Sequence, residues 1–338
     1  MKGQNKAYLF AILAVACWST VASAFKLTLR EVDYLTLLLY SSLTSTVFLF
    51  VVLAAQRKLS LVSASLRPSH ISAGERGQLL RSAANGFLNP FLYYVVLFKA
   101  YSLLPAQEAQ PLNFTWPIML VILSAPMLGE RLRPLSVAAL LISFLGVLIV
   151  STHGDLLGFR VTNALGALLA MGSAVVWAFF WLINVRDKRD EMLKLFLNFL
   201  FGFCYIFVTV LVLRFLAAAP GARAPLTTLI ASPVGEAVPS PMAGAIPPPG
   251  GTSLAGLLGC VYVGILEMGA AFVLWLKALK LSETTAKVSN LIFLSPFVSL
   301  IFIRFVVGEK ILPSSIVGLT FIAGGILLQR ALRYGPER

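Results

Sequence analysis

The amino-acid sequence predicts an all-α polytopic membrane protein with ten transmembrane helices in two inverted five-helix repeats. Three observations support this fold class. Of the 338 residues, 58% are hydrophobic and 12% are charged, the charges cluster between long apolar runs, and one charged motif occurs twice. A helix of about 20 apolar residues spans a hydrocarbon core of about 30 Å. A soluble domain cannot bury this many apolar runs, because its surface must stay mostly polar.

Ten runs are apolar and long enough to be membrane spans, and most of the 27 lysines and arginines lie between them. With the N-terminus in the cytoplasm, most of these basic residues fall on the cytoplasmic side, as the positive-inside rule requires. The net charge of +13 therefore reflects membrane topology. A nucleic-acid partner is not expected, because basic residues do not gather with stacking aromatics on one surface. The expected spans are 7–28, 34–55, 82–102, 105–127, 134–151, 163–184, 193–215, 254–279, 284–305 and 311–329.

The N-terminal stretch has the pattern of a signal peptide with a cleavage site after Ala24. We expect the first span to be retained, because Trp18 in this span has a counterpart, Trp177, in the second half of the chain.

One motif, Gly-Glu-basic-aliphatic-x-Pro, occurs at two places separated by 179 residues. Proline suits the first turn of a helix, glycine can end the preceding helix in a left-handed conformation, and the acid would lie near the positive end of the new helix. We interpret these residues as structural turns, with a gating role for the two glutamates as the alternative. The first copy contains Gly129, Glu130 and Pro134, and the second contains Gly308, Glu309 and Pro313.

Further matches at spacings of 178 and 179 residues indicate two copies of a five-helix unit. Because five is an odd number, the second copy is expected to cross the membrane in the opposite orientation. A segment rich in proline and glycine separates two parts of the second copy and reads as a flexible linker. The expected units are a first repeat (1–152), a second repeat (153–216 and 254–330), an extracytoplasmic linker (217–253) and a cytoplasmic tail (331–338).

Two prolines, Pro117 and Pro296, interrupt the fourth and ninth expected spans at equivalent positions. Each removes one helical hydrogen bond. Irregular backbone inside a membrane is tolerated only where it faces protein or a cavity, so paired interruptions point to a transporter binding site. Simple packing kinks are the alternative.

One acid, Glu267, lies near the centre of the eighth expected span. An ionised carboxylate there costs roughly 2.5–3.5 kcal/mol on insertion scales, so it needs a partner, a water-filled cavity or a proton. Its repeat counterpart is Asn89, in the third span. We hypothesise that Glu267 couples transport to a proton or binds a substrate amine. A protonated acid that is hydrogen-bonded to a neighbouring helix is the alternative.

Aromatic and amide side chains at mid-membrane depth are further candidates for the site. Tyr93 shares a helix face with Asn89, and Asn113 and Asn290 are expected to add hydrogen bonds. Core packing or an interfacial belt explains the tryptophans equally well. The tryptophans that we consider as walls for an apolar or aromatic metabolite are Trp18, Trp116, Trp177 and Trp181.

In their order and repetition, these features resemble the EamA-type drug/metabolite transporter superfamily. The resemblance rests on "CWSTVASAFK" in the first span, a proline within the fourth span, and the following "GER" and "GEK" motifs. It covers nearly the whole chain except 217–253. The resemblance implies ten helices, an inverted-repeat fold and the movement of small organic metabolites, often outward.

We therefore expect a secondary transporter that exports a small organic metabolite, such as an amino acid or an amine, by alternating access around a midplane cavity. The expected location is the bacterial plasma (inner) membrane, with both termini cytoplasmic. A sugar-phosphate or nucleotide-sugar carrier is the alternative within the superfamily, although phosphate would favour basic side chains in the cavity.

An enzyme is disfavoured, because the chain has two isolated histidines and lacks GxSxG, HExxH and phosphate-loop motifs. We expect no metal and no cofactor. The expected partners are the lipid bilayer, the small-molecule substrate and a proton as the candidate coupling ion. The sequence does not identify the substrate, the direction or the coupling, and it does not decide between a monomer and a homodimer.

Overall fold

The computed structural model describes residues 2–66, 73–116, 118–119, 122–123, 127, 134–155, 162–185, 187–218, 253–282 and 290–334. Within these ranges every regular element is a helix. Five helices are long and apolar enough to cross a membrane, and three shorter ones are also apolar. The predicted all-α membrane architecture is therefore confirmed. Ten spans and an inverted repeat remain predictions.

The described helices follow the expected spans closely, and the third and eighth spans are each built from three consecutive elements. The elements are α1 (Lys2–Glu31), α2 (Tyr34–Ala55), α3 (Leu59–Leu66), α4 (Ala73–Gly86), the π-helix η2 (Phe87–Leu92), α5 (Tyr93–Leu103), α6 (Ala106–Asn113), α8 (Pro134–Ser151), α9 (Ala164–Val185), α10 (Glu191–Ala218), α12 (Leu254–Tyr262), the π-helix η3 (Val263–Ala270), α13 (Ala271–Leu281), the 3₁₀-helix η4 (Asn290–Leu294), α15 (Ser295–Phe302), the π-helix η5 (Ile303–Val307) and α16 (Pro313–Tyr334).

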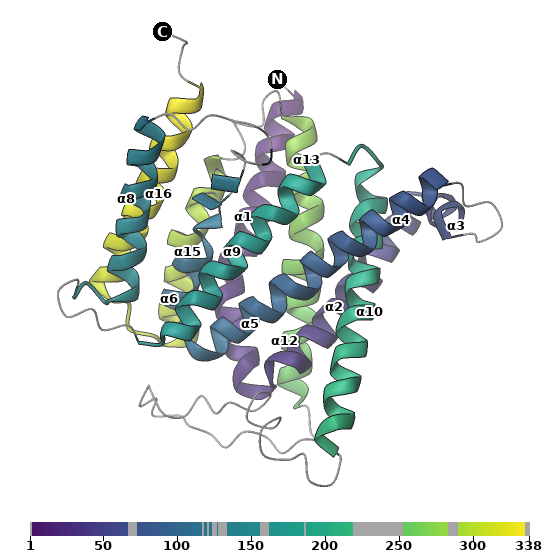
Figure 1. Ribbon diagram of the computed structural model, residues 1–338, viewed down its shortest axis with the longest axis horizontal. Helices are drawn as coiled ribbons and strands as arrows, with labels where there is room; N and C mark the ends of the chain where they lie inside the picture. Colours follow the sequence, from purple (N-terminus) through teal and green to yellow (C-terminus); the bar gives the residue numbers. More distant parts are fainter. Residues whose placement is uncertain are drawn as a thin grey trace.

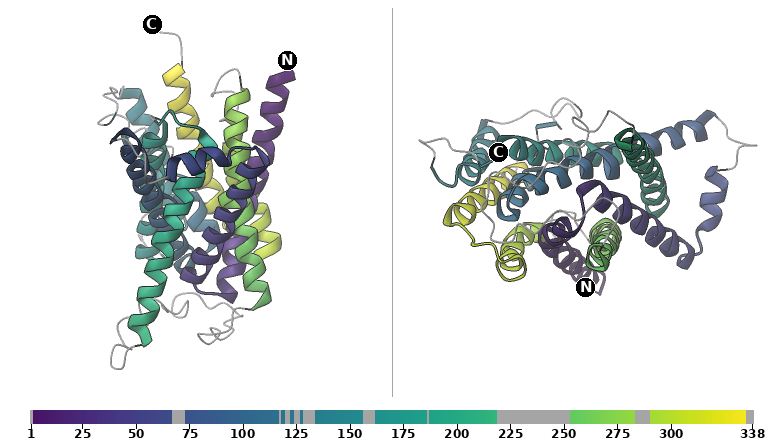
Figure 2. Two further views of the ribbon diagram at one scale, coloured as in Figure 1. Left: turned by 90° about the vertical axis from the view of Figure 1, so that its right-hand side faces the viewer. Right: turned by 90° about the horizontal axis from the view of Figure 1, so that it is seen from below.

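The helices form one bundle, and each of its two ends can be named by the helix termini that lie there (Figure 1). The start of α1 and the end of α16 lie together at one end, which we call the terminal end. At the opposite end, which we call the distal end, α10 finishes and α12 begins (Figure 2). The first and last helices of the chain therefore have their termini on the same side of the bundle.

Local structure repeats at the same spacing as the sequence. Helices α5 and α13 each contain 11 residues and begin 178 residues apart, and each follows a π-helix. Each also ends at a residue with extended backbone, Leu104 and Ser282. Because π-helical turns often mark functional sites in helices, η2 and η3 direct attention to the middle of the third and eighth spans.

The clearest break of a described helix lies at Asn89, whose φ of −148° and ψ of 120° are not helical and which precedes Pro90. The sequence predicts the break of the first repeat at Pro117, which lies outside the described residues. In the second repeat, Pro296 lies in the first turn of α15, directly after η4. The ninth span therefore changes helix type at the proline that the sequence singled out.

The second Gly-Glu motif forms the turn that the sequence predicts, with one difference. Gly308 has a φ of +82° and ends η5, and Pro313 opens α16. Glu309, however, does not cap α16. Its carboxylate accepts hydrogen bonds from the backbone N–H groups of Ala106 (3.1 Å) and Gln107 (3.3 Å), at the start of α6. In the first motif, Pro134 opens α8, and Gly129 and Glu130 lie outside the described residues.

Helices α2 and α10 begin in the same way and are tied to each other at both ends. Asp33 accepts hydrogen bonds from the two N–H groups of residues 35 and 36, and Asp190 does the same for residues 192 and 193. Lys58, just after α2, pairs with Asp190 at 2.7 Å. Arg214, near the end of α10, donates to the Thr36 hydroxyl at 3.2 Å. Burial alone would raise the pKa of Asp190, but hydrogen bonds and the Lys58 charge hold it below its usual range.

Helices α8 and α16 cross at a pair of glycines that bring their backbones into contact. A Cβ atom on Gly318 would lie 2.6 Å from the carbonyl oxygen of Gly146, and one on Gly146 would lie 2.4 Å from that of Gly318. Small residues allow this approach, and close packing is what holds membrane helices together. The Ser143 hydroxyl adds a hydrogen bond to the carbonyl of Ile322 at 3.2 Å.

We predict that Gly318→Ala destabilises the protein, because the added methyl group meets backbone atoms that cannot move aside. Overpacking of this kind costs roughly 1–3 kcal/mol, and thermal unfolding of the purified protein in detergent measures it. Gly324→Ala, on the same helix, is the matched control, since nothing lies within 4 Å of its Cβ position. Equal melting temperatures for the two variants would contradict the crossing.

Candidate functional site

A cavity of about 100 Å³ lies between helices of the two halves of the chain. In the first half its walls come from α1, α5, α6 and the residues just after α6. In the second half they come from α9, η3, α13, η4 and α15. The π-helices η2 and η3 therefore adjoin this region, since η2 runs into α5 and η3 contributes Glu267 to the lining. A pocket formed between two halves is a common place for a ligand site.

All five tryptophans of the chain line this cavity. The ring centroids of Trp18 and Trp275 are 5.6 Å apart, and those of Trp177 and Trp181 are 6.0 Å apart. Tyr93 packs against Trp177 with 4.7 Å between centroids. Four of these tryptophans, including Trp116, were candidates from the sequence, whereas Trp275 was not predicted.

Glu267 lies on η3, is 6% exposed and is one of the residues that line the cavity. Its Oε1 atom accepts a hydrogen bond from the Tyr94 hydroxyl at 3.2 Å. Its Oε2 atom is buried and has no hydrogen-bond partner among the described residues. Among the described lining residues, Glu267 is the only aspartate, glutamate, lysine, arginine or histidine. The cavity therefore presents one acidic group with one oxygen still free to accept a hydrogen bond.

Tyr94, which was not predicted as a site residue, is fully buried and links the first half of the chain to Glu267. The neighbouring Tyr93 was predicted instead, because it shares a helix face with Asn89. Both tyrosines belong to α5, and their rings touch with 4.7 Å between centroids. A sequence pattern gives the faces of a helix, but the neighbour that each face meets depends on how the two halves pack.

A second polar group in the cavity is held in place by its neighbours. Tyr93 donates to Asn113 Oδ1 at 3.4 Å, and Asn113 Nδ2 donates to the Ser173 hydroxyl at 2.8 Å. One turn away on α6, Gln110 also lines the cavity, and its Oε1 atom is buried without a partner among the described residues. The amide groups on α6 therefore add neutral hydrogen-bonding atoms to a lining that is otherwise rich in aromatic rings.

Several predicted site residues lie elsewhere. Asn89 is fully buried but does not line the cavity, and its span packs on α10, where Pro90 meets Gly202. Pro296 is buried beside Ser295, which does line the cavity. Pro117 and the side chain of Asn290 lie outside the described part of the structure.

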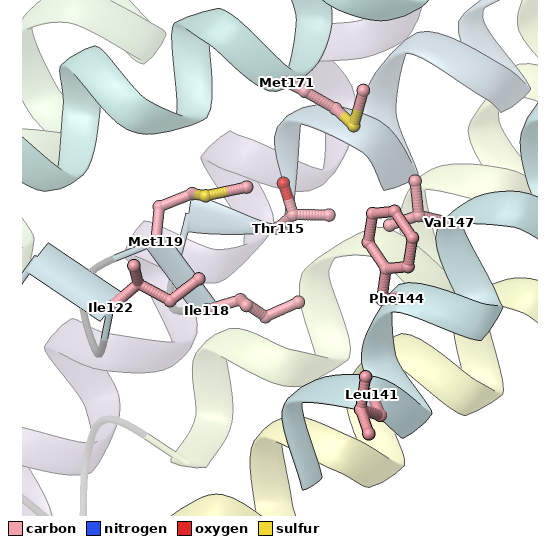
Figure 3. A pocket seen from close by; sticks show the side chains of 8 residues that line it. All are labelled: Thr115, Ile118, Met119, Ile122, Leu141, Phe144, Val147 and Met171. Carbon is pink, nitrogen blue, oxygen red and sulfur yellow. The ribbon is translucent and has the colours of Figure 1, made fainter. Parts of the chain in front are cut away.

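A separate hollow of about 260 Å³ lies between α8, α9 and the chain after α6 (Figure 3). Three of its lining residues, Ile122, Leu141 and Phe144, are exposed on the outside of the bundle. Its one polar side chain, Thr115, already donates to the carbonyl of Leu112 at 2.7 Å. This hollow is an apolar surface groove and offers no polar group for recognising a solute.

Residues 5–152 match the model of the EamA-like transporter family. The chain is 34% identical over 100 residues to "Aromatic amino acid exporter YddG" of Ancylobacter novellus, a match that covers 29% of this chain and 35% of that protein. It is 27% identical over 127 residues to "Uncharacterized transporter YvbV" of Bacillus subtilis, with 37% and 41% covered. The matches thus span well under half the length of these curated relatives.

A solved structure titled "Crystal structure of protein" aligns with the whole fold. The alignment covers 98% of this chain and 100% of that chain, with a TM-score of 0.58 and 20% sequence identity. At this identity the likeness concerns the fold alone. Together with the apolar helices, the match of residues 5–152 to the EamA-like transporter family indicates an integral membrane protein.

Proposed function

We propose that this protein is a secondary transporter that exports a small aromatic metabolite carrying an amino group. The observation that carries the proposal is the lining of one cavity by all five tryptophans and by Glu267, its one described charged residue. In this proposal the cavity is the substrate site, and alternating access exposes it first to one side of the membrane and then to the other.

The tryptophan rings support an aromatic substrate because they offer several faces against which another ring can stack. The same faces attract a cation, and tryptophan is the strongest side chain for this interaction. Glu267 provides the matching charge, with Oε2 free to accept a hydrogen bond from an ammonium group. The relative named an aromatic amino acid exporter agrees with a ring-binding site.

A sugar-phosphate or nucleotide-sugar carrier is less well supported. A phosphate group favours arginine or lysine in its binding site, and the described lining residues include neither. The acid at the wall would repel a phosphate. The cavity therefore favours a cationic or zwitterionic substrate over an anionic one.

We further propose that the terminal end faces the cytoplasm of a bacterial cell, with the protein in the plasma (inner) membrane. The distribution of lysine and arginine in the sequence supports this orientation. A proton then provides a coupling mechanism. Glu267 holds either a proton or the substrate ammonium, so binding of one releases the other.

The first test compares compounds that share an aromatic ring but differ in whether they carry an amine, a carboxylate or both. In proteoliposomes we expect counterflow with tryptamine and with tryptophan, but not with indole-3-acetate, which has the ring and an anionic group without the amine. Glu267→Gln should lower the tryptamine rate by roughly 10- to 100-fold, the value of a lost charged hydrogen bond. The control is Glu31→Gln, because Glu31 is hydrogen-bonded to Ser253 away from the cavity. A wild-type rate and pH profile in Glu267→Gln would refute the role of this acid.

The second test uses the tryptophans as their own reporters. Because all five line the cavity, phenethylamine, which lacks an indole ring, should change the intrinsic tryptophan fluorescence saturably. Lowering the pH should weaken this binding, because a protonated Glu267 cannot pair with the ammonium group. Fluorescence that does not respond to phenethylamine at any concentration would contradict a ligand site among these rings.

The third test addresses Tyr94, which holds one oxygen of Glu267. Tyr94→Phe keeps the ring and removes the donor, so we expect phenethylamine affinity to fall by roughly 2- to 10-fold, the value of one hydrogen bond. Tyr205→Phe is the matched control, because Tyr205 packs with Phe87 and Phe91 outside the cavity lining. Equal affinities for the two variants would show that Tyr94 does not position the carboxylate.

A further inference from the structure

The second Gly-Glu turn binds an element from the other half of the chain. Besides the two backbone bonds to Glu309, the Gln107 side chain donates to the carbonyl of Lys310 at 2.9 Å. Gln107 Oε1 accepts from the N–H of Leu312 at 2.9 Å and from the Ser315 hydroxyl at 3.2 Å. These bonds join the start of α6 to a turn that is more than 200 residues away along the chain.

This junction lies directly beside the cavity on α6. Gln110 and Asn113 line the cavity one and two turns after Gln107 on the same helix. Phe25 and Tyr101, which also line the cavity, are nearly fully buried and pack together with 5.2 Å between ring centroids. Both lie near the distal ends of their helices, α1 and α5. The distal side of the cavity is thus covered by an aromatic contact and by the junction of α6 with the Gly308–Leu312 turn.

The start of α6 depends on the other half of the chain for its capping. Its own N-cap residue is Pro105, which makes no side-chain cap hydrogen bond. The first N–H groups of a helix have no partner inside the helix, and a carboxylate is favoured there by the helix dipole. Glu309 supplies this carboxylate, and water can replace it if the two halves separate. The end of α1 joins the same turn region, because Arg30 donates to the carbonyl of Val307 at 3.0 Å.

We propose that the Gly308–Leu312 turn is a latch that closes the distal end of the cavity, and that Glu309 leaves the start of α6 when this end opens. Hydrogen bonds to a charged group shift an equilibrium by roughly 10- to 100-fold each. A change of this size in the equilibrium constant is enough to shift a protein between two interconverting conformations. The latch rests on the carrier function proposed above, but the labelling test described next needs no substrate.

The test measures access to the cavity from each side of the membrane. In a background in which Cys17, Cys204 and Cys260 are replaced, Ala22→Cys places one thiol on the cavity lining. A membrane-impermeant thiosulfonate reagent is added to right-side-out and to inside-out vesicles. We expect Glu309→Ala to raise the labelling rate from the distal side at least about tenfold, with a smaller rise for Glu309→Gln, which keeps an acceptor oxygen. Glu31→Ala, another acid at the distal end, should leave the rate unchanged.

Two results of the labelling experiment would overturn the latch. One is a distal labelling rate in Glu309→Ala equal to that of the parent. The other is an equal rise from both sides, which indicates general loosening of the fold.

A second variant tests closure directly. This variant carries Gln107→Cys and Lys310→Cys in a background without Ala22→Cys. We expect a short thiol-to-thiol cross-linker between the two cysteines to stop counterflow until the linker is cleaved. Counterflow at the uncrosslinked rate would also overturn the proposal. If no substrate is ever found for the carrier, the labelling result still stands on its own.

Discussion

The rest of this structure depends on one constraint, which is that polar groups inside a hydrocarbon layer must find partners within the protein. Glu267 meets this constraint with one of its two oxygens, because Tyr94 from the first half of the chain donates to Oε1, whereas Oε2 has no partner among the described residues. Asn113 meets it through Tyr93 and Ser173. Each of these contacts joins different spans, so satisfying the polar groups also brings the tryptophan-lined walls together around one cavity.

The Gly-Glu turn shows how one local device serves two purposes. Within its own repeat, Gly308 takes a left-handed conformation and Pro313 starts the next helix. The acid between them then reaches across to the first half and caps α6. A residue that a sequence pattern explains as a local turn can therefore carry a long-range contact, because a helix N-terminus accepts a carboxylate from any part of the chain.

The candidate site was predictable in part. Glu267, Asn113 and the tryptophans of α1 and α9 were found because polar and aromatic groups are conspicuous at mid-membrane depth. Tyr94 was missed because the helix face shared with Asn89 selects Tyr93. Trp275 was missed because its repeat counterpart, Leu97, is aliphatic and does not mark the position. Asn89 matches Glu267 in repeat position, yet its helix breaks there, η2 packs on α10, and Asn89 does not line the cavity.

By itself, the sequence determined the all-α membrane architecture and the conformation of the second turn, because hydrocarbon thickness, helix rise and proline or glycine geometry act locally. It also supplied the repeat spacing at which α5 and α13 begin. Only the tertiary structure decided which faces meet: Tyr94 with Glu267, Glu309 with α6, and Gly146 with Gly318. These contacts depend on the rotation and crossing of whole helices, which a periodic pattern of apolar residues leaves open.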